Sequence, residues 1–183
     1  SHTVSLRVED EVGGLCVTST QLTIGSPPNL QVTSPISGGV HSVASTIIFS
    51  ATATDQEDLS SDISMSWVSD IDGMMSSQSP DSSGNVSFAT SALSSGLHNI
   101  LVSATDTSGL VTTSSLLLRV NNPPTQPSIA IVPSSADAQD DLSLTYGGST
   151  DADGDLVTYS IEWLKDGVLT SLTSDTIPAT ATI

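Results

Sequence analysis

Three aspartates alternate along one short segment of this sequence, STDADGDLVTYSIEW at 149–163: Asp151, Asp153 and Asp155. Several carboxylate oxygens in one loop are the ligands that a hard cation such as Ca²⁺ takes, and Gly154 permits the sharp turn that such a loop needs. The same carboxylates could instead act as a catalytic acid and base, or could only face solvent in a turn. The choice among these three interpretations depends on the elements on either side.

A second acidic loop, with Asp55, Glu57 and Asp58, lies 96 positions earlier in the sequence. It keeps the negative charge but changes the spacing and has no glycine, so we expect it to bind a cation more weakly. Asp10 and Asp106 occupy two further turns. Like charges held together raise one another's pKa and destabilise the fold unless a cation is present. We therefore predict that calcium is the cofactor of these loops and stiffens the joint between repeats.

The composition narrows the classes of partner. The chain has 183 residues and a formal net charge of −17, with Arg7, Arg119 and Lys165 as its permanent cations. Such a chain cannot neutralise phosphates, so nucleic acid and anionic membrane surfaces are poor partners, whereas cations and basic protein surfaces are favoured. No apolar run has the length of a membrane span. Serine and threonine are abundant and aromatic residues make up only 3%, which predicts strands and turns rather than helices.

The sequence repeats with a period of 96 residues. Segment 1–28 aligns without a gap to segment 97–124, and the same shift aligns landmarks in the regions that follow. The aligned pairs are His2 with His98, Asp10 with Asp106, Gly13 with Gly109, Pro27-Pro28 with Pro123-Pro124, Asp55 with Asp151 and Trp67 with Trp163. Repeats of this length with short alternating strands are typical of immunoglobulin-like β-sandwiches, so we predict an all-β fold of tandem sandwiches.

Apolar and polar residues alternate in five segments of the middle repeat, and alternation turns one face of each strand inward. The repeat extends the same prediction to Trp163 as a core residue and to His2 and His98 as inward-facing structural residues. Cys16 has no second cysteine to pair with, so we predict a small core residue rather than a reactive thiol. The inward positions of the middle repeat are Ile47, Phe49, Ala51 and Ala53; Ile63, Met65 and Trp67; Val86 and Phe88; Ile100, Val102 and Ala104; and Leu116, Leu118 and Val120.

Two segments resemble a known group of extracellular proteins. GLHNILVSATD at 96–106 is similar to the penultimate strand of PKD-type and related immunoglobulin-like surface repeats, with histidine where that family usually has tyrosine. DADGDLVTYSIEWLKDG at 151–167 resembles the second-to-third strand region of the same repeats, although the tight turn typical of PKD repeats is absent after Trp67 and Trp163. Cadherin-like bacterial or archaeal repeats are similar as well. This resemblance implies an extracellular or cell-surface location, and calcium where a linker such as that starting at Asn121 meets these loops.

The period also predicts the domain boundaries. Residues 1–25 match the last two strands of a repeat, 26–121 match a complete repeat, and 122–183 match the first strands of another, with Ile183 in the place of Leu93. An incomplete sandwich exposes its core and an unpaired edge. Two explanations stay open. Either residues 1–25 of one molecule complete residues 122–183 of a neighbouring chain, head to tail, or the sequence is a window of a longer tandem array.

Catalysis is the least favoured interpretation of the acidic residues. A thin sandwich offers little room for a pocket where an acid and a base converge, and the three histidines of the chain form no triad. Asn85-Val86-Ser87 is a sequon for N-glycosylation, which is a weak signal by itself.

We therefore predict a non-enzymatic structural module of an extracellular filament, stalk or adhesin, whose partners are copies of itself or neighbouring repeats. The alternative is a binding module, either a ligand-binding adhesin with a cell-surface or glycan ligand, or an accessory region of a secreted hydrolase. An exposed aromatic platform would favour that alternative.

Overall fold

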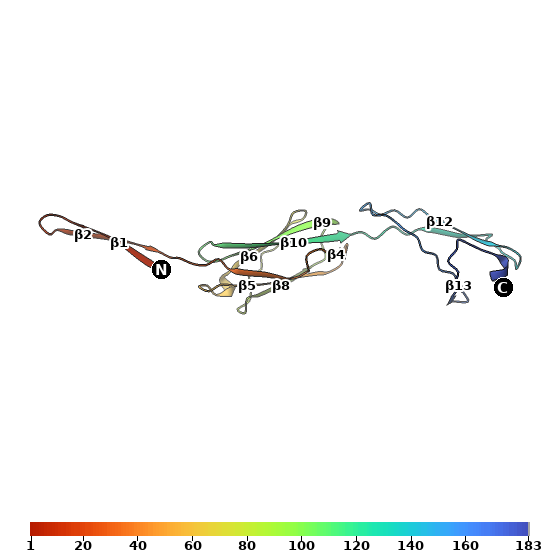
Figure 1. Ribbon diagram of the computed structural model, residues 1–183, viewed down its shortest axis with the longest axis horizontal. Coiled ribbons are helices and arrows are strands. Elements are labelled where there is room, and N and C mark those ends of the chain that lie inside the picture. The colour runs from red at the N-terminus through yellow and green to blue at the C-terminus, as the bar shows by residue number, and fades with distance from the viewer. Residues whose placement is uncertain (183) are drawn as a thin grey trace. The chain divides into compact units, whose positions relative to one another are not determined.

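A computed structural model describes residues 1–182, and these are built almost entirely of strands (Figure 1). Helical turns occur within this range only at η1 (Ser60–Asp62) and α1 (Ala179–Thr182), so the predicted all-β class is confirmed. The chain divides into two compact units, Ser1–Val120 and Asn121–Ile183. No helix in the described part of the chain is long and apolar enough to cross a membrane.

The first unit contains a sandwich of two sheets. The three-stranded sheet has the order β3 (Asn29–Ser34), β5 (Ile47–Thr54), β8 (Asn85–Thr90). The five-stranded sheet has the order β4 (Gly39–Ser42), β10 (Val111–Asn121), β9 (Gly96–Thr105), β6 (Ser64–Ser69), β7 (Gly73–Ser76). Strand β9 lies between β6 and β10 and runs antiparallel to both, so it is a central strand.

The core of this sandwich contains most of the alternating residues that the sequence predicts, together with Leu93; Val86 of β8 is buried, whereas Phe88 is partly buried and packs against the core. Every predicted inward residue of β5, β6, β9 and β10 is buried, and Ile63 directly before β6 is buried with them. Trp67 is fully buried and meets the rings of Phe49 and Phe88 edge to face, with centroids 5.9 Å and 5.4 Å away. Edge-to-face contacts place the positive ring edge against the negative ring face, which adds to the free energy of burial. The prediction of Trp67 as the core anchor is confirmed.

The same unit begins with a hairpin of β1 (His2–Glu9) and β2 (Leu15–Leu22). Every residue of both strands is exposed. This corrects the predictions for Cys16 and His2, which place both side chains against a core. Alternation assigns a residue to a face of its strand, but a face becomes buried only when a second sheet covers it.

The second unit has short strands in place of a closed sandwich. Its largest sheet has the order β11 (Ser128–Val132), β12 (Leu142–Gly147), β15 (Thr176–Ile177), and β13 (Leu164–Lys165) forms a small separate hairpin with β14 (Val168–Leu169). Ile177 is its only buried apolar residue within the described part of the chain. The assignment of Ile183 to the place of Leu93 falls outside the described residues.

Trp163 differs from the sequence prediction. It is only partly buried, and the segment 157–163, within the region 151–167 that resembles the second and third strands of surface repeats, has no regular strand pairing. Its counterpart β6 is held between β9 and β7 in the first unit. No counterpart of β9 pairs with this segment in the described part of the second unit, so the ladder of backbone hydrogen bonds that would fix an extended strand is missing there. The carbonyl of Trp163 instead accepts the N–H of Thr170 at 2.9 Å.

Candidate functional site

The β1–β2 hairpin reproduces the β9–β10 hairpin pair by pair. In β1–β2, His2 lies opposite Leu22 and Glu9 opposite Leu15. In β9–β10, His98 lies opposite Leu118, and the remaining pairs follow at the same shift of 96 positions. The repeated sequence therefore encodes the same strand register twice.

The turns of the two hairpins also agree. The N–H of Asp10 donates to the carbonyl of Gly14 at 2.9 Å, and that of Asp106 donates to the carbonyl of Leu110 at 3.0 Å. In each turn the aspartate Oδ1 accepts an N–H from four residues later, at 2.6 Å in the first hairpin and 2.7 Å in the second. Gly13 and its counterpart Gly109 have φ of 83° and 87°, a conformation that favours glycine. The aspartates thus act as turn caps.

The burial of the two hairpins is opposite. Ile100, Val102 and Leu118 are 0% exposed, because the three-stranded sheet covers them. Their counterparts Val4, Leu6 and Leu22 are 60%, 63% and 55% exposed. The hairpin therefore presents to solvent a face that has the pattern of a sandwich core.

The second unit has the complementary feature, an open apolar groove. A cavity of about 440 Å³ lies between β11, β12 and segment 159–164. Its lining includes Ile129, Leu144, Tyr146, Tyr159 and Trp163. The indole N–H of Trp163 donates to the carbonyl of Ser174 at 2.8 Å, which fixes the ring in the wall of this groove. At the shift of 96, Tyr159, Ile161 and Trp163 in its lining align with the buried residues Ile63, Met65 and Trp67.

One of the predicted cation ligands in each acidic loop, Asp55 in the first and Asp151 in the second, caps its own turn. Oδ1 of Asp55 accepts the N–H groups of Glu57 at 2.8 Å and Asp58 at 3.1 Å. Oδ1 of Asp151 accepts those of Asp153 at 2.8 Å and Asp155 at 3.2 Å. The backbone N–H donors favour the ionised carboxylate and hold the pKa of Asp55 below its ordinary value, although its desolvation acts in the opposite direction. Its Oδ2 is buried and has no hydrogen-bond partner among the described residues.

Glu57 and Asp153 align at the shift of 96 positions. Each accepts hydrogen bonds from the residue that precedes a Pro-Pro pair. The N–H and hydroxyl of Ser26 donate to the carboxylate of Glu57 at 3.3 Å and 3.4 Å. The N–H of Asn122 donates to Oδ2 of Asp153, and its side-chain amide donates to Oδ1 at 3.2 Å. Both linkers are therefore fixed to the acidic loop of the repeat that follows them.

Asp58 has another role, because its carboxylate accepts the N–H and hydroxyl of Thr107 at 2.8–3.0 Å. This joins the loop before β6 to the turn that Asp106 caps. Among the described residues, no three or more Asp, Glu, His or Cys side chains form a group that could hold a metal ion. The calcium sites predicted at Asp151, Asp153 and Asp155, at Asp55, Glu57 and Asp58, and at Asp10 and Asp106 stay predictions.

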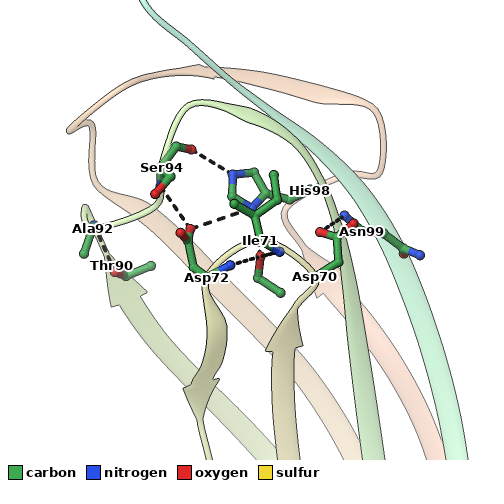
Figure 2. Close-up of polar contacts among 9 residues, drawn as sticks. Asp70, Ile71, Asp72, Thr90, Ala92, Ser94, His98 and Asn99 are labelled. Carbon is green, nitrogen blue, oxygen red and sulfur yellow. Dashed lines mark hydrogen bonds and ion pairs between the residues drawn. The ribbon is translucent and has the colours of Figure 1, made fainter.

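A polar network surrounds His98 inside the sandwich (Figure 2). Its Nε2 lies 2.8 Å from the carbonyl of Ser94, which can only accept, so this nitrogen carries a proton. Nδ1 lies 2.8 Å from the hydroxyl of Ser69 and 3.8 Å from Oδ2 of Asp72. Ser69 in turn accepts the N–H groups of Ile71 and Asp72, each at 3.1 Å. The prediction of a structural, inward-facing His98 is confirmed.

Asp72 completes this network from the β6–β7 turn. Its burial raises the pKa, but the N–H of Ser94, which donates at 2.9 Å, and the nearby His98 ring outweigh that effect, so the pKa lies below its ordinary value. Next to it, Asp70 accepts the N–H of Asn99 at 2.8 Å. The network therefore ties the β6–β7 turn to the start of β9 (Figure 2).

Asn85, the first residue of the sequon, is exposed at the start of β8. Its N–H donates to Oδ1 of Asp81 at 2.9 Å, so its backbone is fixed by a turn.

The sequence prediction did not include the residues that fix the linkers and the histidine. Ser26 and Asn122 have a detectable signal, because they align at the shift of 96 and both precede Pro-Pro. Ser69 and Ser94 have none, because serine is abundant and their contacts to His98 depend on the fold.

No protein-family model matches the chain, and no curated protein matches it. Among solved structures it is similar to the fibronectin(III)-like modules of CbhA from Clostridium thermocellum. The identity is 17%, the match covers 82% of this chain and 75% of that chain, and the TM-score is 0.42. At this TM-score the similarity adds nothing to the β-sandwich assignment, which rests on the sheets themselves.

Proposed function

We propose that this chain is a structural module of an extracellular filament, stalk or adhesin built from tandem immunoglobulin-like sandwiches. Residues 1–25 are the last two strands of one sandwich, 26–121 are a complete one, and 122–183 are the first strands of another. The observation that carries this proposal is that β1–β2 has the register and turn of β9–β10 while its inward face is exposed.

The proposed role requires that another sheet covers the exposed apolar face of the β1–β2 hairpin. An isolated two-stranded hairpin is marginally stable in water, and its edges can pair with other strands. Burying a Val, Leu or Ile side chain contributes roughly 1.5–3 kcal/mol when it was fully exposed. Val4, Leu6, Val8, Leu22 and Ile24 are 55–65% exposed, so covering them would contribute roughly 5–10 kcal/mol before the cost of association.

Within this chain, the apolar groove of the second unit is the surface on which the hairpin can dock. The described residues of the second unit include no counterpart of β9 or β10, and β1–β2 has the pattern of that pair. If the hairpin of one copy docks on the second unit of the next, the contact joins two different surfaces and does not close on itself, so it produces a filament. In a longer polypeptide, a neighbouring repeat would supply the same contact.

The fixed linkers support a stiff array. Glu57 and Asp153 anchor the residues before the two Pro-Pro pairs, and proline-rich linkers are extended spacers. Extracellular location is supported by the resemblance of 96–106 and 151–167 to surface repeats. This role needs length and stiffness, and it needs no catalytic group.

One observation favours the binding module as a second candidate. Tyr146 and Tyr159 are 44% and 42% exposed, with ring centroids 5.2 Å apart, and both line the groove. Exposed aromatic rings are suited to stacking against a sugar ring. Titrating soluble oligosaccharides while recording tyrosine and tryptophan fluorescence distinguishes the two candidates, because the structural module predicts no change.

The test of the structural proposal is to supply the missing strands. The full chain is extended at its C-terminus by a flexible linker and a second copy of residues 1–25. We expect the amides of 160–165 to become protected from hydrogen exchange, because the added hairpin pairs with them. The control carries Leu6→Asp in the added copy and should show no protection. An extension that leaves 160–165 as unprotected as the control would contradict the proposal.

A further inference from the structure

The first unit contains a template for the docked register. Strand β6 pairs with β9 so that Met65 lies opposite Ala104, Ser66 opposite Ser103 and Trp67 opposite Val102. The counterparts of these residues at the shift of 96 lie in the second unit and in the hairpin. Transferring the register therefore places Ile161 opposite Val8, Glu162 opposite Arg7, and Trp163 opposite Leu6.

The transferred register joins opposite charges at one position. At this position the first unit has Ser66 opposite Ser103, whereas the transferred register places Glu162 opposite Arg7. Both serines are partly exposed between buried neighbours, so this position lies on the outer face of the sheet. Arg7 and Lys165 are the only permanent cations in the two segments concerned, and the chain carries a net charge of −17.

We propose that the partner of the β1–β2 hairpin is the 160–165 segment of a second copy of this chain, and that the cross-strand pair Arg7–Glu162 fixes their register. This inference rests on the proposed function. Arg7 already donates to Oε2 of Glu9 at 2.9 Å along its own strand. In the docked state it would lie between Glu9 and Glu162 and compensate both.

The charges distinguish registers that the apolar pattern does not. A shift of one residue turns the apolar face outward and is excluded by the pattern itself. A shift of two residues keeps the faces, so the alternation of Leu6 and Val8 cannot exclude it. In one direction, however, such a shift moves Arg7 to Leu164 and places Glu9 opposite Glu162, and like charges directly opposite are destabilising.

The end of the docked hairpin differs from the template. Lys165 stands where Ser69 binds His98, and Val168 aligns with Asp72. His2 therefore does not regain the contacts that its counterpart makes. We expect the ordered pairing to begin at Val4, opposite Lys165, and to extend to Glu9.

The test uses the full 183-residue chain and its charge reversals Arg7→Glu and Glu162→Arg. Sedimentation velocity measures the association constant. Opposite charges that face each other across two strands are stabilising and like charges are destabilising, so each single variant should associate roughly three- to tenfold more weakly. The double variant Arg7→Glu with Glu162→Arg should associate more strongly than either single variant, because it restores an opposite-charge pair, although Glu9 loses its partner. Glu11→Arg, in the exposed β1–β2 turn, changes the net charge as much as Glu162→Arg and should not weaken association.

The outcomes separate this inference from the proposed function. Association of the wild-type chain that is not weakened by either reversal would overturn the Arg7–Glu162 pair and leave the structural module intact. If the wild-type chain stays monomeric while an appended hairpin still protects the amides of 160–165, the partner of the hairpin is not a second copy of this chain. The proposed structural module would still hold. If the appended hairpin gives no protection, the proposed function fails and this inference fails with it.

Discussion

The hairpins β1–β2 and β9–β10 are nearly the same element in two environments. Their strands pair in the same register, and their turns have the same aspartate cap and the same left-handed glycine. In β9–β10 the inward residues are fully buried, whereas in β1–β2 they are more than half exposed. The comparison shows that register is encoded locally, by turn chemistry and strand pattern, whereas burial depends on a second sheet.

The two tryptophans show the same contrast. Trp67 lies in a paired strand between two sheets and is fully buried, while Trp163 lies in an unpaired segment and is partly exposed. Covering strands therefore determine both the burial of the ring and the regularity of the backbone that carries it.

The largest effect is expected from truncating these rings. Trp67→Ala should lower the free energy of unfolding of the first unit by roughly 3–5 kcal/mol, because it leaves a cavity against Phe49 and Phe88. Trp163→Ala should lower the free energy of unfolding of the second unit by much less, because its ring is already partly exposed and loses fewer contacts. Urea unfolding followed by circular dichroism measures both. Equal losses for the two variants would contradict the contrast.

A smaller contrast is expected between the hairpins. Ile100→Ala should cost roughly 2–5 kcal/mol, since its side chain is 0% exposed. Val4→Ala, at the aligned position, should cost about 0.5 kcal/mol or less under the same dilute conditions. The comparison becomes sharper at high protein concentration, where Val4→Ala should also reduce association. A large decrease in the free energy of unfolding for Val4→Ala in the monomer would show that another part of the chain already covers the hairpin.

The turn caps should give a still smaller effect. Asp106→Ala removes the acceptor of the Leu110 N–H, a hydrogen bond of 2.7 Å at an 8% exposed residue, and should cost about 1–2 kcal/mol. Asp10→Ala removes the same bond in the exposed hairpin and should leave global stability unchanged, while speeding amide exchange at Gly14. Hydrogen exchange followed by NMR reports both sites. Unchanged exchange at Gly14 would argue against the capping role.

The pH dependence of stability tests the network around His98. The pKa of Asp72 in the folded chain lies below its ordinary value of 3.8, so the unfolded chain takes up a proton at higher pH than the folded chain does. Its contribution to stability is therefore complete above about pH 5 and is lost as the pH falls through 3.8 towards the lower folded value. Asp72→Asn should flatten this part of the profile, measured as urea midpoints between neutral and acidic pH. A profile as steep as that of the wild type would contradict the assignment.

Calcium should have the smallest effect. Calcium added to protein that was first treated with a chelator should bind at Asp151, Asp153 and Asp155. This binding should raise the melting temperature of the second unit. Magnesium is the matched control, because it demands stricter octahedral geometry. Since Oδ1 of Asp151 already accepts two N–H groups, the gain should be modest. A melting temperature that does not change with calcium would contradict the prediction of a calcium site.

Much of the first unit could be predicted from the sequence. Residues such as Phe49, Val102 and Leu118 alternate with polar neighbours, and in a closed sandwich this alternation reports burial directly. Strands β3, β4 and β7 were not predicted; β4 and β7 have only four residues, too few to show alternation, and β3 has only two apolar residues, Leu30 and Val32.

The errors have one physical cause. His2, Cys16 and Trp163 were expected in a core because their counterparts or their patterns belong to one, but a pattern cannot say whether covering strands are present. The linker anchors Glu57 and Asp153 were recognised only as acids. Their partners lie 31 positions away in the sequence, and the fold alone brings them together.

The most direct test of the account is the mass of the dissolved chain. Sedimentation equilibrium over a wide concentration range should give a mass that rises with concentration above the 18.7 kDa of one chain. The mass should return to that value in the Leu6→Asp variant, because this substitution places a charge on the docking face. A mass of 18.7 kDa at every concentration, with rapidly exchanging amides in both β1 and 160–165, would contradict docking between copies.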